Sequence, residues 1–223
     1  MKQYQTSLYC PNCKQETVHD VTDWQHERDR SNDRSECTVC HFYWSGMTGK
    51  YYPPEGFKGK KVLFLDFDGV LNDSGFVQNA LKDVGPIAQY TIELAQTTLD
   101  PARVAKVQHI CDVTGADVVL VTGWRRWAKF EELCSALKFT GLTAPVIDKV
   151  GGVKMSGDLR RWATAEWLEE NPAYTRHVVL DDDTNLWQDW NGKKNDLICV
   201  HPFEGIEDKH VAQVIGILGS KDG

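Results

Sequence analysis

The sequence predicts an α/β protein in which helices cover both faces of a Rossmann-like, doubly wound parallel sheet. Short apolar runs that are typical of buried strands alternate with helical patterns from residue 60 onward. Three of these runs end in acidic or hydroxyl side chains, and the carboxyl ends of parallel strands meet at one edge of a sheet. The first 50 residues differ, because they carry two Cys-x-x-Cys pairs. We therefore expect a small metal-binding domain over residues 1–50, a linker over 51–59 and the α/β domain over 60–223.

Length, charge and composition restrict the class of protein. The 223 residues suffice for one sizeable core plus a small appendage, and their composition is ordinary for a soluble globular protein. The net charge of −7 argues against a whole-surface nucleic-acid binder, although it leaves room for a local basic groove. The N-terminus has no apolar core like that of a signal peptide, and no apolar stretch is long enough to span a bilayer. We expect a cytoplasmic protein that has no membrane partner.

The N-terminal segment is organised by four of the seven cysteines. Cys10 and Cys13 form one Cys-x-x-Cys motif, and Cys37 and Cys40 form another. This spacing is typical of a tetrahedral zinc site with four sulfur ligands, in a protein of a reducing compartment. The spacer between the pairs is rich in charge and poor in apolar residues, so the segment needs the ion to fold, with a metal contribution on the order of 10 kcal/mol. The segment resembles a zinc ribbon. Ribbons are compatible with nucleic-acid ends and also bind proteins, so a protein partner at the ribbon stays open.

Capping residues and apolar periodicity mark the helices of the α/β domain. Asp100 and Pro101 supply an N-cap and a first-turn proline, and Gly115 ends the same helix. Further helices are predicted at 127–137, from Ser156 to Asn171, and at 207–218. Strands are predicted at 62–65, 116–121, 146–147, 177–180 and 197–200. Two prolines and two glycines within residues 51–59 interrupt any regular structure, which marks the linker.

The first strand ends abruptly in two carboxylates, Asp66 and Asp68. Gly69 follows at once and permits a sharp turn. In open α/β sheets, ligands bind just outside the carboxyl ends of the strands. Close, partly desolvated carboxylates are costly unless a cation or a reaction uses them. The other polar strand ends expected at this edge are Thr122, Asp181 and Asp182.

These strand ends resemble the motifs of the haloacid dehalogenase (HAD) superfamily over residues 61 to about 218. In family order the four motifs correspond to Asp66-Phe67-Asp68-Gly69-Val70, to Thr122, to Lys154 with Arg160 and Arg161 as rival cations, and to Asp181-Asp182. The finer pattern is similar to the HAD domain of Swiss Army Knife RNA-repair proteins, a group similar to polynucleotide 3′-phosphatases. That group usually has Ser-Ser-x-Trp-Arg where this chain has Thr-Gly-Trp-Arg, but Thr122 keeps the hydroxyl.

The resemblance implies a Mg²⁺-dependent phosphomonoester hydrolase that works through an aspartyl-phosphate. Asp66 would be the nucleophile, and Asp68 would protonate the leaving oxygen and then activate water. Thr122 would hold phosphoryl oxygens, and Lys154 would offset their negative charge. The implied magnesium ligands are oxygens of Asp66, of Asp68 through its backbone carbonyl, and of Asp181 and Asp182.

The intervals 71–99 and 123–153 are short, so we expect a minimal cap or none and an open site that suits a polymer end. Arginines beside aromatic residues could grip phosphate and stack a base. The candidate substrate-binding residues are Gly123, Trp124, Arg125, Arg126, Arg160 and Arg161. The alternative is that the tryptophans belong to the core and the arginines to a solvated helix face.

The sequence favours a phosphatase that acts on nucleic-acid termini carrying a 3′-phosphate, or on nucleotides. A protein phosphatase of the same chemistry is one alternative. A non-catalytic adaptor, in which the ribbon binds a partner and the HAD domain is a scaffold, is another. No Walker loop Gly-x-x-x-x-Gly-Lys occurs in the chain, so a kinase half is absent from it.

Overall fold

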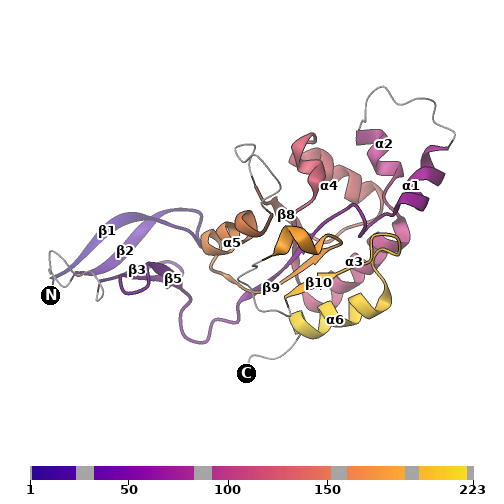
Figure 1. The fold of residues 1–223 in the computed structure, drawn as a ribbon. Coiled ribbons are helices and arrows are strands. Elements are labelled where there is room, and N and C mark those ends of the chain that lie inside the picture. The colour runs from indigo at the N-terminus through magenta and orange to yellow at the C-terminus, as the bar shows by residue number, and fades with distance from the viewer. Residues whose placement is uncertain (1, 24–32, 83–91, 152–159, 189–195, 220–223) are drawn as a thin grey trace. The chain divides into compact units, whose positions relative to one another are not determined.

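The chain divides into two compact units. The computed structural model describes residues 2–23, 33–82, 92–151, 160–188 and 196–219 (Figure 1). One unit comprises residues 1–60 with 165–175, and the other comprises residues 61–164 with 176–223. Within the described ranges there are two five-stranded sheets, and no helix is long and apolar enough to cross a membrane.

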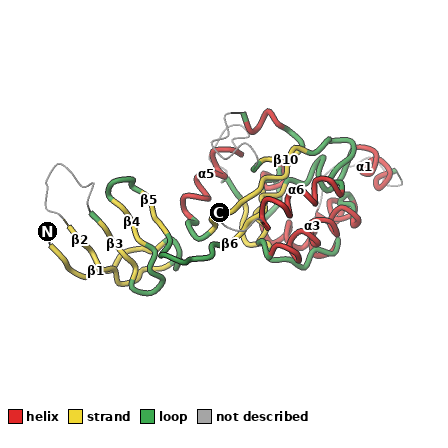
Figure 2. The backbone as a smooth tube through the Cα atoms, turned by 90° about the horizontal axis from the view of Figure 1, so that it is seen from below, coloured by secondary structure: helices red, strands yellow, loops and turns green. Residues whose placement is uncertain are grey.

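The N-terminal sheet is an antiparallel meander, in which each strand pairs with the next one along the chain (Figure 2). Its strands are β1 (Lys2–Cys10), β2 (Gln15–Asp23), β3 (Arg34–Cys37), β4 (Tyr43–Ser45) and β5 (Lys50–Tyr52). The two Cys-x-x-Cys pairs lie in the tight turns after β1 and after β3. In each turn the residue after the second cysteine has a left-handed backbone, with φ of 56° at Lys14 and 61° at His41. The two turns are therefore built alike.

The four cysteine sulfurs of these turns gather in one place. The Sγ atoms of Cys10 and Cys40 are 3.5 Å apart, those of Cys13 and Cys37 are 3.9 Å apart, and all four lie within 4.8 Å of one another. A tetrahedron with Zn–S distances of about 2.3 Å has edges of about 3.8 Å, so the arrangement fits a zinc ion. Burial raises the pKa of Cys10 and Cys13, so a cation is needed to hold all four sulfurs as thiolates.

Two residues assigned to the linker from the sequence belong to the sheet instead. Tyr51 and Tyr52 form β5, paired with Trp44 and Tyr43 of β4. The Tyr52 ring stacks on the Tyr43 ring at 5.5 Å. Aromatic residues fit the pleated surface of a strand, and this cross-strand pair outweighs the nearby prolines and glycines.

The second sheet has the strand order β10-β9-β6-β7-β8, which is the order of a doubly wound fold. Its strands are β6 (Lys60–Leu65), β7 (Asp117–Leu120), β8 (Val146–Lys149), β9 (Tyr174–Asp181) and β10 (Leu197–Cys199). Parallel pairing is found between β6 and β7, between β7 and β8, and between β9 and β10. The chain runs outward from β6 to β7 and β8, then returns to β9 on the other side of β6. The predicted fold class is confirmed, and the order reverses between β6 and β9.

Helices cover this sheet on both faces. The helices described after β6 are α1 (Ser74–Leu81), α2 (Ile92–Thr97), α3 (Pro101–Thr114), α4 (Phe130–Phe139), α5 (Arg160–Glu170) and α6 (Asp208–Gly219), with 3₁₀ turns at Gly123–Arg126 and Thr184–Trp187. In both views α3 and α6 lie side by side on one face of the sheet (Figures 1 and 2). Figure 1 shows α4 on the other face. The α3 helix begins and ends as predicted. The Asp100 side chain accepts a hydrogen bond from the Ala102 backbone N–H at 2.8 Å, and Gly115 has a φ of 69°.

Other helices depart from their predicted bounds. The α4 helix begins three residues later than predicted, because a 3₁₀ turn precedes it and the Lys129 backbone N–H donates to the Glu132 carboxylate at 2.6 Å. The predicted start at Ser156 lies outside the described residues. Two helices that the sequence did not predict, α1 and α2, occupy the described part of the interval 71–99. This insert is small, in line with the expected minimal cap.

We expect the four-cysteine cluster to hold one Zn²⁺ per chain. Replacing both Cys37 and Cys40 with Ser should abolish zinc retention and unfold the meander, since metal binding contributes on the order of 10 kcal/mol to such segments. Elemental analysis and circular dichroism measure the two effects. Cys134→Ser changes a partly buried thiol on α4 and should keep the full zinc content. Stoichiometric zinc in the double variant would contradict the assignment.

Candidate active site

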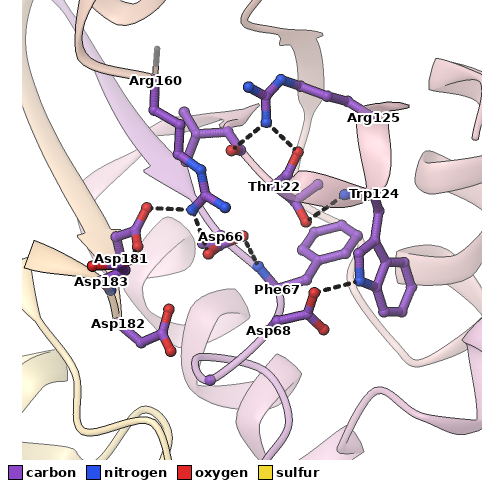
Figure 3. A network of polar contacts seen from close by, with 12 residues as sticks. Asp66, Phe67, Asp68, Thr122, Trp124, Arg125, Arg160, Asp181, Asp182 and Asp183 are labelled. Atoms are coloured by element: carbon purple, nitrogen blue, oxygen red, sulfur yellow. Dashed lines mark hydrogen bonds and ion pairs between the residues drawn. The ribbon is translucent and has the colours of Figure 1, made fainter. Parts of the chain in front are cut away.

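The polar residues predicted from the strand ends come together at the carboxyl edge of the second sheet (Figure 3). Asp66 directly follows β6, Thr122 lies just beyond β7, and Asp181 ends β9. Backbone hydrogen bonds continue past the strands, from the Asp66 N–H to the Leu180 carbonyl at 3.1 Å and from the Val121 N–H to the Leu65 carbonyl at 3.0 Å. The residues thus lie where the strand order reverses, which is the usual ligand position in this type of sheet.

Three carboxylates converge at this point. Oxygens of Asp66, Asp181 and Asp182 lie within 4.8 Å of one another, and Asp66 and Asp181 are each only 1 % exposed. Burial, together with the negative charge of Asp181, raises the pKa of Asp66 to about 8. The same two causes raise the pKa of Asp182 to about 6. A divalent cation would relieve this repulsion, and three carboxylate oxygens are the hard ligands that Mg²⁺ prefers.

A buried guanidinium already offsets part of the charge. Arg160 Nη1 lies 2.5 Å from Asp66 Oδ2 and 2.6 Å from Asp181 Oδ2. The side chain is 8 % exposed, so these ion pairs are shielded from water. With one positive and three negative groups, the cluster has a net charge of −2 when every carboxyl is ionised, which one divalent ion would neutralise. Lys154, the first choice for the third-motif cation, lies outside the described residues.

Asp68 has a different setting from Asp66, two residues earlier. Its side chain is exposed and stands apart from the carboxylate cluster. Oδ2 accepts a hydrogen bond from Trp124 Nε1 at 2.8 Å (Figure 3). Oδ1 accepts one from Asn72 Nδ2 at 3.2 Å. The Asp68 carboxylate thus makes both of these hydrogen bonds outside the cluster of the other three aspartates.

Gly69 allows the first motif to approach the fourth. Its φ is +71°, and a Cβ atom there would lie 2.2 Å from Asp182 Oδ2 and 2.4 Å from Asp182 Cγ. Any larger residue would have to displace the Asp182 side chain. The sequence showed that a glycine permits a turn here, but the contact with Asp182 depends on the tertiary fold.

The second motif forms a 3₁₀ turn that buries Thr122. The Thr122 hydroxyl oxygen accepts a hydrogen bond from the Trp124 backbone N–H at 3.3 Å. Arg125 Nη1 donates to the carbonyls of Thr122, at 2.6 Å, and Val121, at 3.1 Å. Arg125 thus braces the turn through Nη1, and its contact with substrate stays a prediction. Gly123 lies close to the Arg160 guanidinium, because a Cβ atom added to Gly123 would be 3.8 Å from Arg160 Nη2.

The remaining candidate substrate-binding residues differ in exposure. Trp124 is only 4 % exposed and packs edge-on against Phe67 at 5.1 Å, which leaves too little surface to stack a base. Arg126 is exposed, as is the neighbouring Trp127 at 46 %. Arg161 donates to the Gln188 carbonyl, and its guanidinium lies 5.4 Å from the ring centre of Trp162.

Sequence reasoning missed two contacts of the site. Asn72 is buried, accepts a hydrogen bond from the Gly69 backbone N–H at 3.1 Å and donates to Asp68. The second contact is the indole hydrogen bond of Trp124, which was predicted to bind substrate. No spacing rule pairs residue 68 with residue 124, and only the parallel register of β6 and β7 brings them together.

A comparison with protein families identifies the domain that carries this site. The family model described as the HAD domain in Swiss Army Knife RNA repair proteins matches residues 62–211, which is more than half of the chain and contains every active-site residue discussed above. No curated protein matches the chain. The match supports phosphatase chemistry of the HAD type. The chain belongs to the family of HAD domains found in Swiss Army Knife RNA repair proteins.

Proposed function

We propose that the chain is a Mg²⁺-dependent phosphomonoester hydrolase that works through an aspartyl-phosphate and acts on nucleic-acid termini with a 3′-phosphate, or on nucleotides. One observation carries the proposal, namely the convergence of Asp66, Asp181 and Asp182 on one point beside the exposed carboxylate of Asp68. Membership of the HAD family supports phosphatase chemistry at such a site.

The carboxylates of Asp66, Asp181 and Asp182, with the backbone carbonyl of Asp68, would hold Mg²⁺. Bound there, the ion would neutralise charge on the phosphoryl group, whose negative oxygens otherwise repel an attacking carboxylate. In this scheme Asp66 would be both a metal ligand and the nucleophile. Its buried position suits both roles, and the Phe67 backbone N–H donates to its Oδ1 at 2.8 Å.

Two carboxylates divide the chemical steps. In the first step a bond forms between an Asp66 oxygen and phosphorus, the ester P–O bond breaks, and Asp68 gives its proton to the departing oxygen. In the second step Asp68 takes a proton from water while the water oxygen bonds to phosphorus. The bond between phosphorus and Asp66 then breaks, which restores the free carboxylate and releases inorganic phosphate.

Thr122 and Arg160 would hold the phosphoryl oxygens. The Thr122 hydroxyl oxygen accepts from a backbone N–H, which leaves its own proton for donation to a ligand. Arg160 carries the only cation that the described residues place on Asp66 and Asp181, so we assign it the third-motif role ahead of Arg161. The guanidinium of Arg160 has five N–H donors, so it can donate to a phosphoryl oxygen while it keeps an ion pair with a carboxylate.

Exposure around the site supports a polymeric or nucleotide substrate. Asp68 is open to solvent, so a leaving group attached to a large molecule can reach it. Exposed indoles, Trp127 and Trp162, lie next to arginines in the segments that follow the second motif and begin α5. Aromatic rings with arginines suit the bases and phosphates of a single strand. The family description, which names RNA repair proteins, points the same way.

A phosphate-release panel tests this function. Oligonucleotides with a 3′- or a 5′-phosphate, mononucleotides and a phosphopeptide should be compared in the presence of Mg²⁺ and after treatment with EDTA. We expect release from the nucleic-acid substrates, loss of release with EDTA and recovery on adding Mg²⁺. Preference for the phosphopeptide would favour a protein phosphatase. Undiminished turnover after exhaustive removal of divalent ions would contradict the metal assignment.

We further propose that the N-terminal meander is a separate, zinc-holding module and that residues 60–223 form the hydrolase. The cysteine geometry supports the zinc. The boundary between the two units at residues 60 and 61 supports the separation, although residues 165–175 group with the N-terminal unit. The meander would then bind either the nucleic acid that carries the phosphate or a protein partner.

Asp66→Asn should lower kcat by at least about a thousandfold, because an amide oxygen cannot replace the attacking carboxylate. Circular dichroism should show the native fold. Asp112→Asn makes the same change at an exposed position on α3 and should leave kcat unaltered. Substantial turnover by the Asp66 variant would exclude the aspartyl-phosphate route.

Gly69→Ala should weaken Mg²⁺ binding about 10- to 100-fold, because the new methyl group displaces Asp182. Mg²⁺ titration of activity and of thermal stability measures the effect. Gly115→Ala is the matched control, since Gly115 has almost the same positive φ but no atom within 4 Å of its Cβ position. Equal Mg²⁺ affinities for the two variants would show that Asp182 is not a ligand.

A further inference from the structure

Asp68 is exposed, yet both of its carboxylate oxygens are held by side-chain donors. Trp124 Nε1 donates to Oδ2 at 2.8 Å and Asn72 Nδ2 donates to Oδ1 at 3.2 Å. An exposed aspartate without such partners rotates among several conformers. A group that transfers protons must instead stay within about 3 Å of the reacting oxygen. The two donors therefore restrict the carboxylate to one orientation, as proton transfer requires.

The indole that holds Oδ2 is itself fixed by the fold. Trp124 is buried, packs edge-on against Phe67 at 5.1 Å, and lies 5.5 Å from the Trp127 ring. Its backbone N–H is held by the Thr122 hydroxyl oxygen. Phe67 lies between Asp66 and Asp68 in the first motif, so the contact of its ring with Trp124 ties the indole to the segment that carries both carboxylates.

The two oxygens of Asp68 are not equivalent. Asn72 Oδ1 accepts the Gly69 backbone N–H, which can only donate, and this fixes the amide with Nδ2 toward Asp68. The hydrogen bond from Asn72 to Oδ1 is the longer of the two. An indole N–H also only donates, and it bonds best to the oxygen that carries no proton. The transferable proton thus belongs on Oδ1.

We propose that Trp124 is a positioning residue, which holds Asp68 through Oδ2 so that Oδ1 serves as the proton-transfer oxygen. The inference rests on the proposed function, in which Asp68 is the general acid and base. In the first step the Oδ1–H bond breaks and its proton moves to the departing ester oxygen as phosphorus bonds to Asp66. In the second step Oδ1 takes a proton from the attacking water, and the bond between phosphorus and Asp66 breaks.

The leaving group provides a test of this role. Phenolate from phenyl phosphate is basic and gains from protonation, whereas nitrophenolate from 4-nitrophenyl phosphate departs without it. Trp124→Phe keeps an aromatic ring but removes the N–H. In single-turnover experiments we expect it to slow phenol release by about tenfold or more and nitrophenol release by no more than about threefold. A merely structural role would slow both equally.

Two controls separate positioning from loss of packing. Trp167→Phe makes the same change at a buried tryptophan that contacts Tyr174, and it should not alter the ratio of the two rates. In an Asp68→Asn background, Trp124→Phe should have no further effect on phenol release, because its target is already gone. An undiminished effect in that background would overturn the proposal.

A spectroscopic measurement tests the contact without depending on turnover. The chain has eight tryptophans, and Asp68→Ala should move one indole N–H resonance, the same one that disappears in Trp124→Phe. No movement of that resonance would overturn the proposal. If the wild-type chain releases phosphate from neither ester, from no phosphorylated oligonucleotide and from no mononucleotide, the proposed function fails and the positioning role fails with it. If it hydrolyses both and Trp124→Phe slows both equally, only the positioning role fails.

Discussion

The repulsion among three carboxylates at a nearly dry sheet edge is the constraint on which the rest of the active site depends. Asp66 and Asp181 come from adjacent strands and are almost fully buried, so neither can relieve its charge by turning to solvent. Arg160 supplies one compensating charge between them. Gly69 leaves the space that the third carboxylate occupies. What remains is an unbalanced negative charge at a defined point, which is the physical basis of our proposal that the site binds a divalent ion and then a phosphoryl group.

Burial separates two aspartates that are only two residues apart, Asp66 in the interior and Asp68 at the surface. In the proposed mechanism, the buried carboxylate would act as the nucleophile without competition from bulk water. The exposed carboxylate would exchange protons with the leaving group and with solvent. The alternation of a strand would not by itself separate them in this way. The turn at Gly69 and the packing of Phe67 on Trp124 turn the second carboxylate outward while the first stays in the core.

The carboxylate cluster could be predicted because the sequence itself shows apolar runs that end in acidic residues. The carboxyl ends of parallel strands lie at one edge of a sheet, which brings these residues together. The bounds of α3 were also predictable, because Asp100, Pro101 and Gly115 act locally. What the sequence could not show is the direction of side chains across the fold. Arg125 turns inward onto carbonyls and Trp124 is buried on Phe67, although both looked like substrate contacts in the sequence. Arg160 and Arg161 are neighbours, and only the direction of each side chain from α5 decides that one reaches Asp66 and the other reaches Gln188.

The strand order has a consequence for how the protein is made. Strands β6, β7 and β8 follow one another along the chain and can pair as soon as each emerges, but the other side of β6 must wait for β9. Closing such a long loop is entropically costly and slow compared with local pairing. The centre of the sheet therefore has an open edge during synthesis, and the acidic cluster is completed only when β9 docks. The N-terminal meander, whose strands pair in sequence order, has no comparable delay. A ribosome would thus release a finished N-terminal meander well before the carboxylate cluster exists.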